Sequence, residues 1–132
     1  MFKVKVFAPG KSKEGWLLEA LAEYEKRLKG RMEIEWVHAD PRSALKEPYL
    51  IALDVKGEPV SSEALSEKLF KSGQRLAFVI GDAEGLDVEV LEKAKWRWSL
   101  SPLTFTHQMV RLILVEQLYR ALEIERNSPY HK

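Results

Sequence analysis

One segment of ten residues joins an apolar run to a loop of glycines and carboxylates, and it reads LAFVIGDAEG over residues 76–85. Five consecutive apolar residues that end at a glycine are typical of a strand covered on both faces, as the strands of a parallel sheet are. A second run of this kind covers residues 49–53 and ends at Asp54. Two such strands with helical segments between and beyond them predict an α/β fold, with a mostly parallel sheet and helices on both faces.

The segments on either side complete the order β-α-β-β-α-β-α-β-α. Alternation of apolar and polar residues predicts strands over 2–7 and 33–38, and a short aromatic segment predicts the last strand over 96–100. Apolar residues at helical spacing predict helices over 14–29, 61–71 and 107–124, and a short helix after Asp87. We expect residues 40–48 to be a loop with at most one helical turn, and residues 56–59 to be a turn.

Composition limits the class of protein. The 132 residues are 45% hydrophobic and 31% charged, which is typical of one globular domain spanning residues 1–132. The absence of cysteine excludes disulfides, a thiolate nucleophile and cysteine-ligated metals, and the three histidines form no local metal motif. No apolar run approaches the roughly 20 residues of a membrane-spanning helix. We therefore expect a soluble cytoplasmic protein that needs neither a metal nor a membrane.

The predicted helix over residues 107–124 is apolar on almost every side. Glu116, Arg120 and Glu123 form its one narrow polar stripe, which we expect to be an i,i+4 ion pair at a rim. A helix that is apolar all round must be buried all round, and one sheet covers only one side of it. We therefore expect a second copy of the chain to cover the rest, as in a homodimer.

Ligands of parallel sheets bind beyond the carboxyl ends of the strands, so a site is expected after Leu53, Ile80 and Leu100. The loop over 81–85 lacks the lysine and the hydroxyl of a phosphate-binding loop. Its two carboxylates would favour a ligand with ribose hydroxyls, an amine or a positive centre. The alternative is a tight turn whose acidic side chains are simply solvated.

The loop over 101–106 has backbone amides and carbonyls that are suited to a flat heterocycle, which Leu103 and Phe105 would pack against. His107 and Arg111 are four residues apart, so both should project from one helix face beside this loop and suit a polyanionic substrate. The alternatives are that His107 caps the helix or lies in the core, and that Arg111 is solvated.

The C-terminal tail, residues 127–132, carries Tyr130, His131 and Lys132. Such side chains can stack on a base and contact phosphate. The alternative is that the tail is frayed, as chain termini often are.

Four segments together resemble the RlmH family. They are residues 80–86, 98–111, 116–121 and 127–131, and the likeness extends from the first strand to the end of the chain. Members of this family are SPOUT-class methyltransferases, which use S-adenosylmethionine to methylate N3 of a pseudouridine in 23S ribosomal RNA. Where the family commonly has Gly-Gly-Pro-Glu-Gly, this chain has Asp82 and Ala83 inside the loop, and it is shorter between Asp40 and Tyr49.

The resemblance implies a C-terminal trefoil knot, a homodimer and a cofactor pocket. The pocket would be formed by nine residues, which are Leu53, Gly81, Asp82, Leu100, Ser101, Pro102, Leu103, Thr104 and Phe105. The residues near the RNA would be His107, Arg111, Tyr130 and His131, with the tail completing a site with the partner subunit.

Methyl transfer would require the methyl donor to be aligned with N3 of the pseudouridine. The proton on N3 must leave before or while N3 attacks the methyl group. His107 is the first candidate for the base and His131 the second, and Arg111 is a candidate to stabilise the developing anion. A net charge of +1 gives little bulk attraction to RNA, so we expect a shaped target such as the assembled ribosome. The rival interpretations are another base as substrate, or a non-catalytic dimeric α/β module that binds a nucleotide or RNA.

Overall fold

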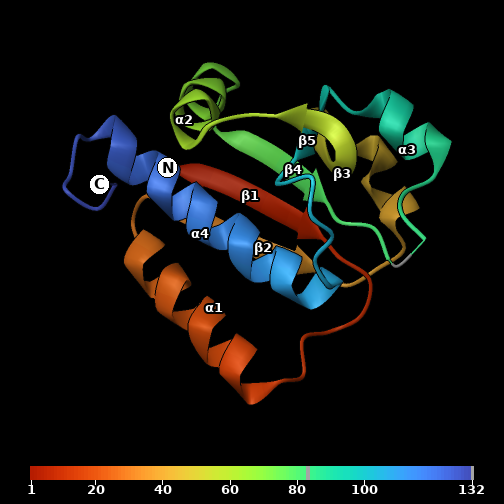
Figure 1. The fold of residues 1–132 in the computed structure, drawn as a ribbon, viewed down its shortest axis with the longest axis horizontal. Coiled ribbons are helices and arrows are strands. Elements are labelled where there is room, and N and C mark those ends of the chain that lie inside the picture. Colours follow the sequence, from red (N-terminus) through yellow and green to blue (C-terminus); the bar gives the residue numbers. More distant parts are fainter. Residues whose placement is uncertain (83, 132) are drawn as a thin grey trace.

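The structure, a computed structural model, describes residues 1–82 and 84–131 (Figure 1). Its strands and helices follow the predicted order with one added 3-10 helix, η1. The elements are β1 (Phe2–Phe7), α1 (Gly15–Leu28), β2 (Met32–Val37), η1 (Pro41–Lys46), β3 (Leu50–Pro59), α2 (Ser62–Lys71), β4 (Arg75–Val79), α3 (Val88–Lys93), β5 (Trp96–Ser99) and α4 (His107–Glu125).

The five strands form one parallel sheet in the order β2-β1-β4-β3-β5. Val79 of β4 lies opposite both Phe7 of β1 and Ala52 of β3, so β1 and β4 end side by side, next to the first part of β3. The amide of Ile80 extends the ladder by donating to the carbonyl of Phe7 at 2.8 Å. The loops after these strands therefore leave the sheet at one common edge.

Helices cover both faces of the sheet, which confirms the prediction from the apolar runs. α1, α2 and α4 lie on one face (Figure 1), where Leu17, Leu69 and Leu118 pack with strand residues such as Val6 and Phe78 in the larger core cluster. η1 and α3 cover the other face through a smaller cluster that includes Ala44 and Val90. The sheet is thus buried on both sides, as continuous apolar strands require.

Two expectations for the connecting segments were wrong. Residues 56–59, expected to be a turn, belong to β3, because this strand bends and pairs with β5 again, so that Trp98 lies opposite both Leu53 and Glu58. Gly57 permits this close return, since a Cβ there would lie 2.6 Å from the carbonyl oxygen of Arg97. Residues 41–46, expected to contain at most one helical turn, form η1, whose first turn is capped by the Asp40 side chain.

α4 contacts both α1 and α2 of the same chain, so its environment differs from the one expected. These neighbours and the sheet bury a continuous face that includes Leu114, Val115 and Leu118. The apolar side chains of Leu112 and Ile113 are only half-buried, and Met109 is exposed. One chain therefore covers more of the helix than expected, and the second copy stays a prediction. Within the described residues, no helix combines the length and apolarity needed to cross a membrane.

Candidate functional site

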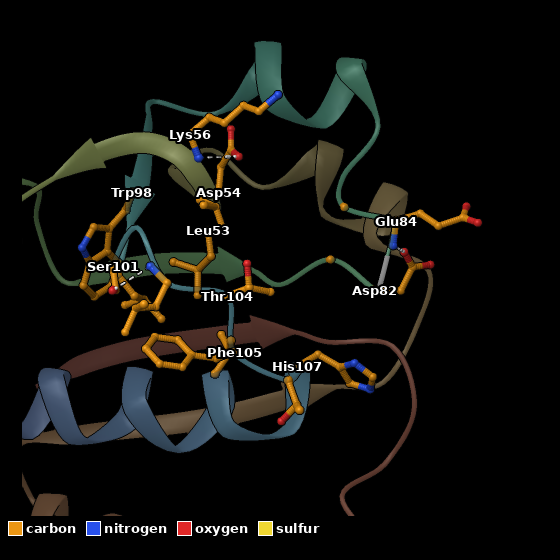
Figure 2. Close-up of a pocket in the computed structure, with 17 residues that line it drawn as sticks. Leu53, Asp54, Lys56, Asp82, Glu84, Trp98, Ser101, Thr104, Phe105 and His107 are labelled. Atoms are coloured by element: carbon orange, nitrogen blue, oxygen red, sulfur yellow. Dashed lines mark hydrogen bonds between the residues drawn. The ribbon is translucent and has the colours of Figure 1, made fainter.

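A cavity of about 650 Å³ opens at the edge of the sheet where β3, β4 and β5 end (Figure 2). Apart from Pro102, which lies outside it, every residue expected in the cofactor pocket lines this cavity. These residues are Leu53, Gly81, Asp82, Leu100, Ser101, Leu103, Thr104 and Phe105. Residues as far apart in the sequence as Leu53 and Phe105 thus form one site, as the sheet order dictates.

The loop after β4 folds tightly back on itself. The Gly85 amide donates to the Asp82 carbonyl at 3.0 Å, and Gly85 has a φ of 86° that favours glycine. A Cβ on Gly81 would lie 2.7 Å from the carbonyl carbon of Gly85. The Asp82 carboxylate accepts a hydrogen bond from the Glu84 amide at 2.9 Å, whereas the Glu84 side chain points away from the cavity in Figure 2. The two glycines therefore give the loop its shape at the cavity wall.

The loop between β5 and α4 forms the opposite wall and is held by its own hydroxyl groups. The Ser101 hydroxyl accepts from the Leu103 amide at 3.0 Å, and Thr106 caps α4 by accepting from the Met109 amide. The backbone amides of Thr104 and Phe105 donate to none of the described residues. Donors at an apolar wall are what a flat heterocycle with ring nitrogens requires.

His107 lies at the mouth of the cavity, as the sequence predicted. It is exposed, it lines the cavity, and its imidazole bonds to none of the described residues (Figure 2). The cap of α4 is Thr106, so His107 is neither the cap nor a core histidine. The ring is accessible to a ligand.

Arg111 is not brought into the cavity with His107. Its side chain is fully buried and donates to the Pro9 carbonyl at 2.7 Å and to the Ser12 hydroxyl at 3.0 Å. Burial lowers the pKa of the guanidinium, while the nearby Glu14 carboxylate opposes this shift. Arg111 therefore holds the loop between β1 and α1, and the alternative of a solvated arginine is wrong.

The tail is packed rather than frayed, and it turns back along α4 from the end of the helix that lies away from the cavity (Figure 1). The 19 residues of α4 span about 27 Å. Tyr130 contacts Tyr119 and Glu116 of this helix, and His131 bonds to Arg120 and to Glu63 of α2. The predicted Glu116–Arg120 ion pair is present at 2.8 Å, whereas Glu123 is buried with Arg31 and Arg126 and does not share this rim. Lys132 lies outside the described residues.

Several lining residues were not among the predicted site residues. Val55 and Lys56 line the cavity because β3 bends there. No local sequence pattern predicts this bend. Val110 lines the cavity one helical turn after His107, and the i,i+3 spacing of helices was a usable signal for it. In the part of the chain that the structure describes, no three His, Cys, Asp or Glu residues are grouped as metal ligands would be.

Both the sequence and the fold of this chain are similar to those of known proteins. The family model described as "Predicted SPOUT methyltransferase" matches residues 2–131. The ribosomal RNA large subunit methyltransferase H of Protochlamydia amoebophila is 47% identical, with both chains covered completely. The protein of the same name from Synechococcus sp. (strain CC9605) is 42% identical over 98% of this chain and 96% of its own.

Solved structures show the same fold at low identity. A "probable methylase family protein" from Haemophilus influenzae Rd KW20 superposes with a TM-score of 0.59 at 12% identity, covering 95% of this chain and 66% of its own. A Legionella pneumophila protein described as a methyltransferase with bound cofactor SAM gives 0.53 at 11% identity, with 92% and 66% covered.

The family match and the architecture together define a SPOUT methyltransferase. The sequence identity to curated relatives over their full length narrows this class to one family. The chain belongs to the RlmH family.

Proposed function

We propose that this chain transfers a methyl group from S-adenosylmethionine to N3 of a pseudouridine in 23S ribosomal RNA, on the assembled ribosome in the cytoplasm. Membership of the RlmH family supports the reaction, since the relatives are named as methyltransferases of large-subunit ribosomal RNA. The observation that carries the proposal is the cavity at the carboxyl ends of three adjacent parallel strands, with an accessible histidine at its mouth.

The residues of the cavity fit S-adenosylmethionine. Its volume of about 650 Å³ lies within the usual range for cofactor sites. Leu53, Leu100 and Phe105 supply apolar walls, and the amides of Thr104 and Phe105 supply donors for the adenine. The carboxylates of Asp54 and Asp82 suit the ribose hydroxyls and the positive charge of this ligand. When bound, S-adenosylmethionine supplies a methyl group activated by its sulfonium charge.

His107 is proposed to accept the N3 proton. Its imidazole lies at the cavity and has no intramolecular partner among the described residues, so a lone pair is available to a substrate. General-base catalysis needs such a group within hydrogen-bond reach of the proton. Arg111 is proposed to act indirectly, because its buried guanidinium shapes the loop between β1 and α1 beside this edge of the sheet.

A homodimer is proposed to join the tail to the cavity. Within one chain Tyr130 contacts Glu116, which lies about 14 Å along α4 from His107. A two-fold axis that pairs two copies of α4 in antiparallel orientation would place Tyr130 and His131 of one subunit near His107 of the other. The half-buried Leu112 and Ile113 and the exposed Met109 supply apolar surface for this contact. The trefoil knot of the family is also proposed, as a feature of the fold of each subunit.

The decisive experiment measures transfer of a labelled methyl group from S-adenosylmethionine to ribosomes that contain or lack the pseudouridines of 23S ribosomal RNA. We expect incorporation only where pseudouridine is present, with the label mapped to N3. Equal incorporation into both preparations would contradict the proposed substrate. Binding of ribosomes without any transfer would favour the non-catalytic module instead.

A further inference from the structure

The tail turns back along α4 because of how the helix ends. Asn127 adopts a left-handed conformation with φ of 57°, its amide donates to the Ile124 carbonyl, and the Ser128 amide donates to the Glu123 carbonyl. This hydrogen-bond pattern is the Schellman motif, which stops a helix and reverses the chain. The Ser128 hydroxyl also donates to the Glu123 carboxylate at 2.9 Å. Tyr130 and His131 are therefore directed toward the polar stripe of α4.

Tyr130 is held there by both packing and hydrogen bonds. Its ring meets Tyr119 edge-on with centroids 4.8 Å apart, and the Arg120 guanidinium lies 4.9 Å from its centroid. Its hydroxyl donates to the Glu116 carboxylate at 2.9 Å and lies 3.4 Å from the hydroxyl of Tyr24. Burial and the bond to this carboxylate raise the pKa of Tyr130. Helix α1 and helix α4 thus both contribute to one fixed position of the ring.

His131 is bonded at both ring nitrogens. Nη1 of Arg120 lies 3.0 Å from Nδ1, and Oε2 of Glu63 lies 2.9 Å from Nε2. A guanidinium can only donate, so Nδ1 must accept and carries no proton. An ionised carboxylate can only accept, so Nε2 must carry the proton. These two contacts therefore specify the neutral imidazole with its proton on Nε2.

Glu116 joins the two tail residues into one network. Its carboxylate accepts from Arg120 at 2.8 Å and from the Tyr130 hydroxyl at 2.9 Å, and the same arginine holds His131. The stripe that looked like an ordinary ion pair is thus the docking surface of the tail.

We propose that Glu116, Arg120 and Glu63 are positioning residues, which hold Tyr130 and His131 in one orientation and keep His131 as the neutral Nε2-protonated tautomer. This inference rests on the proposed function for its catalytic meaning. Because Arg120 occupies the only lone pair of the docked imidazole, His131 cannot accept the N3 proton in this arrangement. His107 is then the remaining histidine candidate for the base.

Nuclear magnetic resonance of the ¹⁵N-labelled full-length protein tests the geometry directly. We expect one pyrrole-like signal at Nε2 of His131 and one pyridine-like signal at Nδ1, with the Tyr130 amide as ordered as the amides of α4. An Nδ1-protonated ring, or an averaged pair of signals with a mobile tail, would overturn the proposal. A His131→Gln spectrum assigns the ring signals.

The variants Glu116→Gln and Glu63→Gln separate positioning from folding. Glu63 is exposed, so its substitution should leave thermal unfolding unchanged while it loosens the His131 ring. We expect either variant to lower kcat/KM for ribosomes roughly tenfold with unchanged affinity for S-adenosylmethionine, since each removes a charged hydrogen bond. Glu33→Gln, which removes an exposed carboxylate from the Lys3 pair, is the matched control and should leave both readouts unchanged.

The two proposals fail in different ways. A wild-type protein that transfers no methyl group would overturn the proposed function, while the tautomer and the order of the tail would still be measured. Variants at Glu116 and Glu63 that keep an ordered tail and full activity would overturn the positioning role alone.

Discussion

Arg111 of α4 donates a 2.7 Å hydrogen bond to the carbonyl oxygen of Pro9, at the end of the strand that borders β4. The same guanidinium also holds the Ser12 hydroxyl, so one buried cation ties the helix that begins at the cavity to the loop between β1 and α1. No carboxylate within the described residues forms an ion pair with it. Arg111 therefore anchors this loop to α4, and we expect its loss to lower the free energy of unfolding.

Replacement of Arg111 by alanine should lower the free energy of unfolding by about 3 kcal/mol, because it leaves a cavity and two unpaired acceptors. Urea unfolding measures this difference. Ser12→Ala removes one of the two bonds and should cost only about 1 kcal/mol. If Arg111→Ala were as stable as the wild type yet inactive, Arg111 would instead contact the substrate.

Stability in acid should depend on Glu123. Burial alone would raise its pKa, but hydrogen bonds from Arg31, Arg126 and Ser128 outweigh this effect and lower the pKa from 4.5 to about 2. A depressed carboxyl pKa stabilises the fold above pH 4.5, and this contribution is lost as the pH falls toward 2. It amounts to on the order of 3 kcal/mol.

The substitution Glu123→Gln isolates this contribution. The variant should be less stable at neutral pH, and its unfolding free energy should change less between pH 4.5 and 2 than that of the wild type. Denaturation series at several pH values provide the comparison. Parallel curves for the two proteins across this interval would show that Glu123 is not the group responsible.

Gly81→Ala should abolish binding of S-adenosylmethionine without unfolding the protein. The new Cβ would lie 2.7 Å from the backbone of Gly85, so the loop at the cavity wall must move. Gly15→Ala is the matched control, since a Cβ there meets nothing within 4 Å and should leave binding intact. Equal affinities of the two variants would mean that this loop does not hold the cofactor.

His107→Gln should reduce kcat by about 100-fold, the lower end of the effect of general-base catalysis, with little change in cofactor affinity. Single-turnover methylation of ribosomes measures the loss. The corresponding His131→Gln variant should weaken the use of ribosomes more than the chemical step. A larger effect on the chemical step from His131 than from His107 would reverse the assignment of the base.

Much of this architecture was predictable from local patterns. The apolar runs before Asp54 and Gly81 predicted two buried strands, and the parallel sheet placed their carboxyl ends together, where the cavity is found. The resemblance then supplied nine residues for the cofactor pocket, of which only Pro102 lies outside the cavity. Strands and their end loops are readable because burial on both faces leaves an uninterrupted apolar signal.

What the sequence did not reveal depends on contacts between distant segments. The bend of β3 exists because Trp98 pairs with both Leu53 and Glu58, and no local pattern encodes that double pairing. Helical spacing put Arg111 on the His107 side of α4, but the loop carrying Pro9 determines where its guanidinium goes. The docking of His131 on Glu63 likewise joins residues 68 positions apart.

Isothermal titration calorimetry of the folded wild-type protein with S-adenosylmethionine tests most directly whether the cavity beyond β3, β4 and β5 is a methyl-donor site. We expect saturable binding that Gly81→Ala eliminates and Gly15→Ala preserves. A folded wild-type protein that produces no heat of binding at any concentration of this ligand would contradict the account.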